Sequence, residues 1–175
     1  MRVRDRAILL SLAALLYIGT SGCAFYAPPA TPAPRTATPV GASFATTWDA
    51  LIDVFAERHI QIRAVDRASG VLVAEPLLLR DSPDSAADCG RGKFLTLTPR
   101  ATDAVWNVLV RGDSSTSTVK ASVRFSRVDR GSIGTSAHTE AEATTDCESR
   151  GNWEATLEKS VKASAETRSH PNGAI

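Results

Sequence analysis

The clearest pattern in this chain is a stripe of large apolar residues between positions 44 and 55. Its members recur every three or four positions, as on one face of an α-helix: Phe44, Trp48, Leu51, Ile52 and Phe55. Thr46 and Asp49 have the spacing of an N-terminal capping box, with Asp in the acidic position. We therefore predict an amphipathic helix over this stretch, capped at Thr46 and ending near His59.

After this helix, apolar and polar residues alternate with a period of two, which is typical of β-strands. Residues 60–64 alternate, residues 66–70 form a turn cluster, and residues 71–75 are again apolar and β-branched, so we predict a hairpin. Residues 76–92 are rich in Asp and Ser and are expected to be mostly loop. Further strands are expected at 93–97, 105–110 and 119–126, and turns at 112–117 and 129–136. Residues 138–145 could form either a strand or a loop.

A second apolar stripe near the C-terminus also has helical spacing. Trp153, Leu157 and Val161 lie four positions apart and predict a second amphipathic helix. The order helix, antiparallel strands, helix is typical of the α+β class. We therefore predict one α+β domain over residues 43–165, an antiparallel sheet of about five strands packed by an N-terminal and a C-terminal helix. A disordered tail is expected over residues 166–175.

The first 22 residues have a different pattern, which is that of an export signal. Three arginines fall within the first six residues, residues 7–18 are almost entirely apolar, and Gly22 comes before Cys23. A retained membrane helix is one alternative, but it needs roughly 20 apolar residues to cross about 30 Å of hydrocarbon. The apolar run here has only twelve. An ordinary secretory signal cleaved elsewhere, for example before Phe25, is the other alternative.

The quartet Thr20-Ser21-Gly22-Cys23 resembles the lipobox of bacterial lipoproteins, although Leu is the commonest residue where this chain has Thr20. The resemblance implies that residues 1–22 are a signal peptide and that Cys23 is the acylated first residue of the mature protein. Ala24 follows Cys23, which in that family implies sorting to the outer membrane, facing the periplasm, if the cell has two membranes. The expected partner of the N-terminus is then the membrane itself.

A proline-rich segment follows Cys23. Five of the nine prolines lie between residues 27 and 40, among Ala and Thr and a single charge, Arg35. Proline fixes φ and donates no backbone hydrogen bond, so such a segment is neither helix nor central strand. We predict that residues 23–42 form an extended tether. At about 3.1 Å per residue, about fifteen residues of it hold the folded part up to roughly 45 Å from the membrane.

The order of these features has a counterpart among known envelope proteins. A lipobox, a proline-rich tether and a helix leading into a hairpin, from Trp48 to Leu51 and from Gly70 to Val73, follow one another here. This arrangement resembles the small helix-and-sheet domains of the outer-membrane assembly lipoprotein BamC and of many uncharacterised envelope lipoproteins. The resemblance covers about residues 15–80 and implies no particular functional residue.

Charge and motifs narrow the function classes. The formal net charge is +1, and loss of residues 1–22, with three Arg and one Asp, leaves the mature chain near −1. Such a balance does not predict a nucleic-acid partner, which calls for a markedly basic domain. The sequence lacks the Gly-x-Ser-x-Gly, His-Glu-x-x-His, phosphate-loop and Cys-x-x-Cys motifs. We therefore favour a non-catalytic binding or structural module without a cofactor, which contacts an envelope protein, a glycan or a lipid.

A pocket in which His138, Glu140 and a third ligand converge would indicate an enzymatic function instead. An apolar cleft lined by tryptophans 48, 106 or 153 would favour binding. The alternative is an envelope hydrolase or metal-dependent enzyme built on His138 and nearby acids. His138, Glu140 and Glu142 are spaced by two, so on a strand they share one face and could ligate a metal. A charged edge strand is the simpler interpretation. Cys147 with His138 as its base is a further candidate nucleophile.

The cysteine count makes a more specific prediction. Of three cysteines, an acylated Cys23 leaves Cys89 and Cys147, and an even remainder in an exported domain normally pairs. The disulfide would join the loop at 76–92 to the entry of the C-terminal helix. Two free buried thiols that behave as small apolar groups are the competing interpretation.

Overall fold

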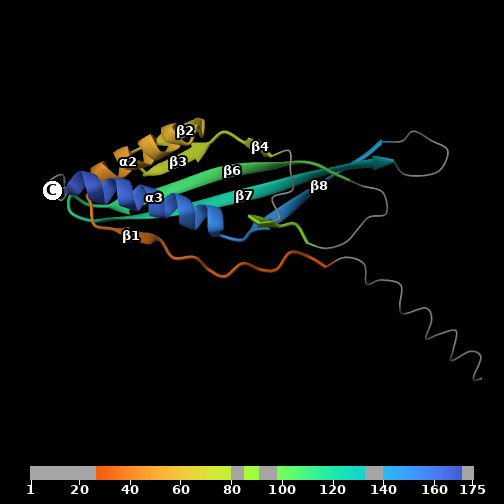
Figure 1. The fold of residues 1–175 in the computed structure, drawn as a ribbon, viewed down its shortest axis with the longest axis horizontal. Helices are drawn as coiled ribbons and strands as arrows, with labels where there is room; N and C mark the ends of the chain where they lie inside the picture. Colours follow the sequence, from red (N-terminus) through yellow and green to blue (C-terminus); the bar gives the residue numbers. More distant parts are fainter. Residues whose placement is uncertain (1–26, 80–84, 91–97, 133–139, 171–175) are drawn as a thin grey trace, which may run out of the picture.

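The computed structural model describes residues 27–79, 85–90, 98–132 and 140–170. An antiparallel sheet carries two helices, so the predicted α+β class is confirmed (Figure 1). In chain order the elements are β1 (Thr38–Val40), α2 (Phe44–Glu57), β2 (Ile62–Asp66), β3 (Val71–Ala74), β4 (Leu77–Leu79), β5 (Ala87–Asp88), β6 (Thr98–Gly112), β7 (Ser117–Ser132), β8 (Glu140–Ser149) and α3 (Asn152–Ser169).

The sheet has eight strands within the described ranges, more than the five or so that we expected. The order is β2-β3-β6-β7-β8-β5, with β1 beside β7 and β4 beside β6, and every pairing is antiparallel. The additional strands β1, β4 and β5 have only two or three residues each. Segments this short show no readable alternation, which needs about four residues or more.

The two central strands are longer than their hydrophobic pattern predicts. β6 and β7 contain 15 and 16 residues. The turn expected at 129–136 is wrong in its first part, because Asp129 to Ser132 pair with Ala143 to Glu140 of β8. Aspartate and glycine are poor strand formers, but pairing with β8 overrides that preference here. Residues 138–145, for which the sequence indicated either strand or loop, form a strand from Glu140 onwards. The strand expected at 93–97 lies outside the described residues.

The predicted helix and hairpin near the N-terminus are both present, but the helix cap lies elsewhere. The Ser43 side chain accepts a hydrogen bond from the Thr46 backbone N–H at 3.2 Å, so the cap at Thr46 was wrong by three residues. Ser43 directly precedes the first residue of the apolar stripe, which explains why the helix begins there. The hairpin of β2 and β3 turns through residues 67–70, as the sequence indicates.

Both helices pack on the same face of the sheet. Alternate residues of the two central strands are buried beneath them: Ala104, Trp106, Val108 and Val110 of β6, and Val119, Ala121, Val123 and Phe125 of β7. Trp153 of α3 stacks on Trp106, with ring centroids 6.0 Å apart. Trp48 and Trp106 are 3% and 4% exposed. These two tryptophans therefore belong to the core, and they do not line an open cleft as the binding hypothesis anticipated.

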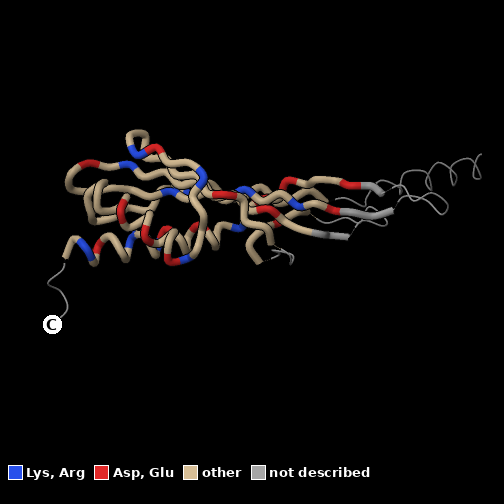
Figure 2. The backbone as a smooth tube through the Cα atoms, turned by 90° about the horizontal axis from the view of Figure 1, so that it is seen from above, with Lys and Arg blue, Asp and Glu red and all other residues tan. Residues whose placement is uncertain are grey.

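One end of the sheet extends beyond the helices as an arm (Figure 1). We define the arm as residues 98–103 of β6, 126–132 of β7 and 140–146 of β8, which pair with one another. Basic and acidic residues are interspersed along it, as Figure 2 shows. The rest of the domain, called the body below, contains both helices.

The C-terminal helix continues beyond the expected end of the domain. α3 reaches Ser169, so the prediction of disorder was wrong for residues 166–169. Two contacts hold this part of the helix: Glu166 accepts a hydrogen bond from the Gly41 backbone N–H at 3.0 Å, and Arg168 pairs with Asp53 of α2. No helix within the described residues is long and apolar enough to cross a membrane.

Candidate functional site

The segment between residues 27 and 40, which we expected to be a free tether, lies along the domain. We call it the N-terminal segment. The Ala30 backbone N–H donates to Asp88 of β5 at 3.2 Å, and β1 at the other end pairs with residues 117–119 of β7. Val40 is buried in the core. The prolines keep the segment extended, as predicted, but an extended backbone also suits an edge strand, where a missing N–H is tolerated.

Along β7, a gap in strand pairing lies between β1 and β8. β1 covers residues 117–119, and β8 begins its pairing at Phe125. The backbone N–H groups of Ala121 and Val123 point into this gap. They donate to two carboxylates of α3, with Ala121 N to Glu158 Oε1 at 2.8 Å and Val123 N to Glu154 Oε1 at 3.2 Å. Buried backbone donors need partners, and here side chains take the place of a strand.

A single cation from the N-terminal segment faces both carboxylates. Arg35 Nη2 donates to Glu158 Oε2 at 3.1 Å, and Arg35 Nη1 lies 3.7 Å from Glu154 Oε2. The Thr38 hydroxyl adds a hydrogen bond to Glu158 Oε2 at 2.7 Å. Both glutamates are only 3% exposed. Buried carboxylates are costly without a countercharge, so Arg35 stabilises the pair and fixes the N-terminal segment in place.

Sequence reasoning missed this cluster, although two signals were present. Glu154 and Glu158 border the apolar stripe of their helix, flanking Leu157, where a charged residue needs a partner. Arg35 is the only charge in the proline-rich stretch. What the sequence could not provide is their proximity, since 123 positions separate Arg35 from Glu158.

Two shallow hollows of about 450 Å³ are each lined in part by the N-terminal segment. One is lined in part by Arg35, Asp88, Glu148 and Arg150. The other is lined in part by Arg35, Glu158 and two lysines of α3. Among the described residues, neither hollow is lined by a histidine or a cysteine, so neither offers the usual nucleophile and base. Both hollows are formed where the N-terminal segment contacts the rest of the domain.

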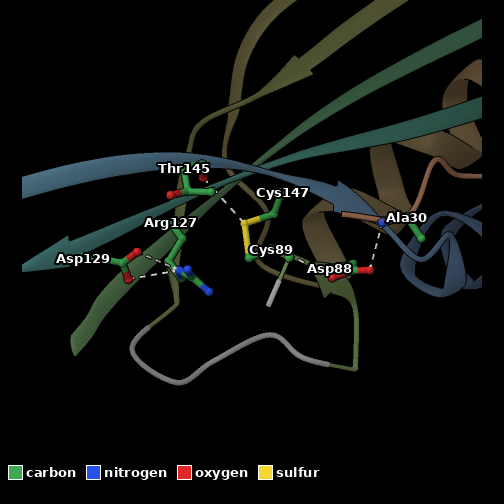
Figure 3. Close-up of a disulfide and its surroundings, with 8 residues drawn as sticks. Ala30, Asp88, Cys89, Arg127, Asp129, Thr145 and Cys147 are labelled. Atoms are coloured by element: carbon green, nitrogen blue, oxygen red, sulfur yellow. Dashed lines mark hydrogen bonds and ion pairs between the residues drawn. A yellow bond between two sulfur atoms is a disulfide. The ribbon is translucent and has the colours of Figure 1, made fainter. Parts of the chain in front are cut away.

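The disulfide between Cys89 and Cys147 is present, as predicted, and both residues are buried (Figure 3). Cys147 lies within β8 opposite Phe125, shortly before the C-terminal helix, so the bond joins the residue after β5 to the paired part of the sheet. Because Cys147 is bonded to Cys89, the hypothesis that it acts as a nucleophile is wrong for this form of the protein. A Cβ added to Gly90 would lie 2.6 Å from the Ala27 carbonyl oxygen.

The metal-binding hypothesis stays a prediction. His138 lies outside the described residues, as does the side chain of Glu140. Glu142 is exposed on β8. In the part of the chain that the structure describes, no group of three or more His, Cys, Asp or Glu residues is placed to hold a metal ion.

Comparisons with known proteins do not place the chain in a family. No protein-family model matches it, and no curated protein or solved structure is significantly similar to it.

Proposed function

We propose that this chain is a lipid-anchored protein of the bacterial cell envelope whose α+β domain acts as a non-catalytic binding or structural module. The observation that carries the proposal is the pairing of Cys89 with Cys147, which leaves Cys23 as the single remaining cysteine. Disulfides persist in oxidising compartments outside the cytoplasm. Cys23 stands at the end of the lipobox-like quartet, where lipoproteins are acylated.

The internal contacts of the polar cluster support a structural role for it. Glu154 and Glu158 bind the backbone of β7 and the Arg35 guanidinium, so their charges already have partners within the fold. Chemistry with an external substrate would have to displace these contacts. The cluster therefore supports a module that holds its own N-terminal segment.

The surface available to an envelope partner is the face of the sheet away from the helices. It presents exposed polar side chains on the two central strands: Asn107 of β6 and Lys120, Ser122 and Arg124 of β7. A polar, solvated face suits contact with a protein, glycan or lipid headgroup. In a cell with two membranes, the proposed location is the outer membrane, facing the periplasm.

Mass spectrometry of the mature protein, purified from membranes, tests the anchor. We expect a chain that begins at Cys23 and carries acyl groups, and we expect Cys23→Ala to remain as the unprocessed precursor. Cys23→Ser serves as a second variant, because a hydroxyl cannot replace the acylated thiol. An unmodified N-terminus at Phe25 or later in the wild-type protein would contradict the proposal.

Elemental analysis of the same preparation tests the non-catalytic part. We expect no stoichiometric zinc or copper. Bound metal that is lost in a His138→Ala variant would instead favour a metal-dependent enzyme.

A further inference from the structure

We infer that the disulfide between Cys89 and Cys147 is a latch for the first part of the N-terminal segment. Its oxidation state decides whether residues 27–34 are bound to the domain or released from it. The part from Arg35 to Val40 stays bound in either state. The latch rests on contacts among the described residues, and it does not depend on acylation of Cys23.

The two neighbours of Cys89 in the chain form the seat of this first part. Asp88 accepts a hydrogen bond from the Ala30 backbone N–H at 3.2 Å, next to the disulfide (Figure 3). The Ala27 carbonyl oxygen lies 2.6 Å from the position that a Cβ would take on Gly90. The Gly90 backbone N–H donates to Asp88 Oδ1 at 2.9 Å, so the two residues of the seat are also bonded to each other. A shift of the seat therefore breaks its contacts with the N-terminal segment.

The disulfide is the covalent tie between this seat and the rest of the sheet. β5 has only two residues and pairs with the end of β8. Two hydrogen bonds of 2.8 Å support it, from the Arg150 backbone N–H to the Ala86 carbonyl and from the Asn152 side chain to the Ser85 carbonyl. The buried side chains here, Ala86 and Ala87, are small and bury little apolar surface. Without the disulfide, such an element opens locally at a far lower cost than that of global unfolding.

The second part of the N-terminal segment is held by elements outside the seat. Arg35 and Thr38 bind Glu158 of α3 at 3.1 and 2.7 Å. The Pro39 carbonyl oxygen accepts a hydrogen bond from Lys162 Nζ at 3.0 Å, and β1 pairs with β7. Opening of β5 leaves these contacts in place. The segment therefore divides just before Arg35 into a part that depends on the disulfide and a part that does not.

Opening the latch requires a reductant, and a dithiol supplies one. One thiolate of the dithiol attacks a sulfur of the disulfide and forms a mixed disulfide, which its second thiol then resolves. The dithiol is oxidised to a disulfide, and its two electrons and two protons leave Cys89 and Cys147 as free thiols. Cys147 lines a hollow of about 430 Å³ together with Pro32 and Ala33, so a dithiol can approach the bond beside the segment that it releases.

Reduction also changes the reach of the domain, a consequence that rests on the proposed acylation of Cys23. With the latch closed, four positions separate Cys23 from Ala27, which already contacts Gly90. With the latch open, the free chain extends to Pro34, eleven positions from Cys23. An extended chain spans at most about 3.5 Å per residue, so the greatest distance covered rises from roughly 14 Å to roughly 39 Å.

Time-resolved fluorescence anisotropy of the purified mature protein tests the latch. A dye is attached through an unnatural amino acid at Thr31, in the first part of the segment, or at Thr36, just beyond Arg35; both side chains are exposed. The oxidised wild type is compared with the same protein after dithiothreitol treatment and with a Cys89→Ser, Cys147→Ser double variant. We expect the rapidly moving fraction of the dye to rise several-fold at position 31 in both, and to stay unchanged at position 36.

A variant with an intact disulfide keeps the test informative if the double variant does not fold, which circular dichroism would show. Gly90→Ala places a methyl group against the Ala27 carbonyl oxygen, so it should mobilise the dye at position 31 without reduction. Gly41→Ala is the matched control. Its added methyl group would lie 3.4 Å from Glu166, an ordinary contact remote from the seat, and should leave position 31 as restrained as in the wild type.

The outcomes separate the latch from the proposed function. A dye at position 31 that is as restrained after reduction as before, or that is unaffected by Gly90→Ala, overturns the latch. An equal rise at positions 31 and 36 on reduction also overturns it, because the segment would then leave the domain as one piece. A mature protein without an acyl group overturns the anchor and the change in reach, while the anisotropy still decides the latch.

Discussion

At the scale of single residues, the C-terminal end of α2 contains a backbone conformation that its sequence does not favour. His59 has a φ of 54°, in the left-handed region. The Ile60 N–H bonds to the Phe55 carbonyl at 2.9 Å, and the His59 N–H bonds to the Ala56 carbonyl at 3.1 Å. This pattern is a Schellman motif, in which glycine is the usual residue at the left-handed position. An L-residue there has a steric cost of about 1–2 kcal/mol.

Replacing His59 with Gly should therefore stabilise the domain. We expect the free energy of unfolding in urea to rise by about 0.5–1 kcal/mol, because relief of the steric cost exceeds the greater backbone entropy that glycine loses on folding. His59 is exposed, so little packing is lost. His59→Ala is the matched control: it removes the imidazole but keeps a Cβ, and it should give no such gain. Equal stabilisation by both variants would show that the imidazole itself is the cause.

Asp113, in the turn after β6, is the second residue whose environment makes a measurable prediction. Its carboxylate accepts hydrogen bonds from the Thr116 N–H at 2.9 Å and from the Ser115 N–H and hydroxyl, each at 2.7 Å. These bonds, that from Thr116 first, lower the pKa of Asp113 to about 2. Because the pKa is lower in the folded state, the carboxylate stabilises the fold above pH 3.8, and this contribution is lost as the pH falls through about 2.

We therefore expect Asp113→Asn to destabilise the domain by an amount that depends on pH. The difference in unfolding free energy between wild type and variant should be constant above about pH 5 and should narrow as the pH falls from about 4 to 2, where both states of the wild type become protonated. Chemical denaturation at a series of pH values measures this difference. A difference that does not change over that range would mean that the charge of Asp113 is irrelevant to the turn.

At the scale of elements, two glutamate side chains of α3 accept the backbone hydrogen bonds that a neighbouring strand would otherwise accept from β7. Loss of the Glu158 carboxylate would leave the Ala121 N–H without its acceptor and would remove the closer partner of Arg35. Removing one member of a buried ion pair typically costs about 3–5 kcal/mol, because the remaining groups stay desolvated and unpaired. Glu158 therefore contributes to the stability of the sheet and of the N-terminal segment as well as to its own helix.

We predict that Glu158→Ala lowers the unfolding free energy by about 3 kcal/mol. Glu166→Ala is the matched control on the same helix, because Glu166 also accepts a backbone hydrogen bond, from Gly41, but in an exposed position. Its effect should stay below about 1 kcal/mol. Urea denaturation of both variants gives the comparison. Similar small losses for the two would mean that water replaces the Glu158 carboxylate at the edge of β7.

The elements that the sequence predicts depend on residues close to one another in the chain, whereas the elements it misses depend on residues far apart in the chain. The stripe that includes Trp48 and Leu51 predicted α2, because a helix depends on neighbours three or four positions away. The cap at Ser43 was missed since Thr46 and Asp49 offer a similar spacing nearby. β1 was missed because its reason to form lies in β7, about 80 positions later. The pattern of a short proline-containing segment holds no information about that partner.

At the scale of the whole molecule, the disulfide closes a loop of 58 residues. The parity of the cysteines was enough to predict this pair, whereas the cluster of Arg35 with Glu154 and Glu158 depends on the folded arrangement and was not predictable. Restricting the unfolded chain by a loop of this length stabilises a domain by about 4 kcal/mol at 25 °C. That is a large share of the total stability of a typical domain.

Reduction should accordingly lower the thermal midpoint of the wild-type protein and leave that of a Cys89→Ser, Cys147→Ser double variant unchanged. We expect the reduced wild type and the double variant to lose about 4 kcal/mol of unfolding free energy relative to the oxidised protein. Thiol titration of the unreduced, denatured protein should detect neither Cys89 nor Cys147. Two titratable thiols in protein isolated from the envelope would contradict the assignment.

The contact between Arg35 and Glu158 joins the first part of the domain to its last helix, and this has a consequence for the order of assembly. A chain made from its N-terminus presents β1 and the central strands before it presents α3. Until α3 arrives, the donors of Ala121 and Val123 face solvent along an open strand edge, which attracts other strands. Contacts this distant in sequence also form slowly. Nascent or C-terminally truncated chains are therefore the species most prone to aggregate, and the cell must keep them apart until the final eighteen-residue helix closes the sheet.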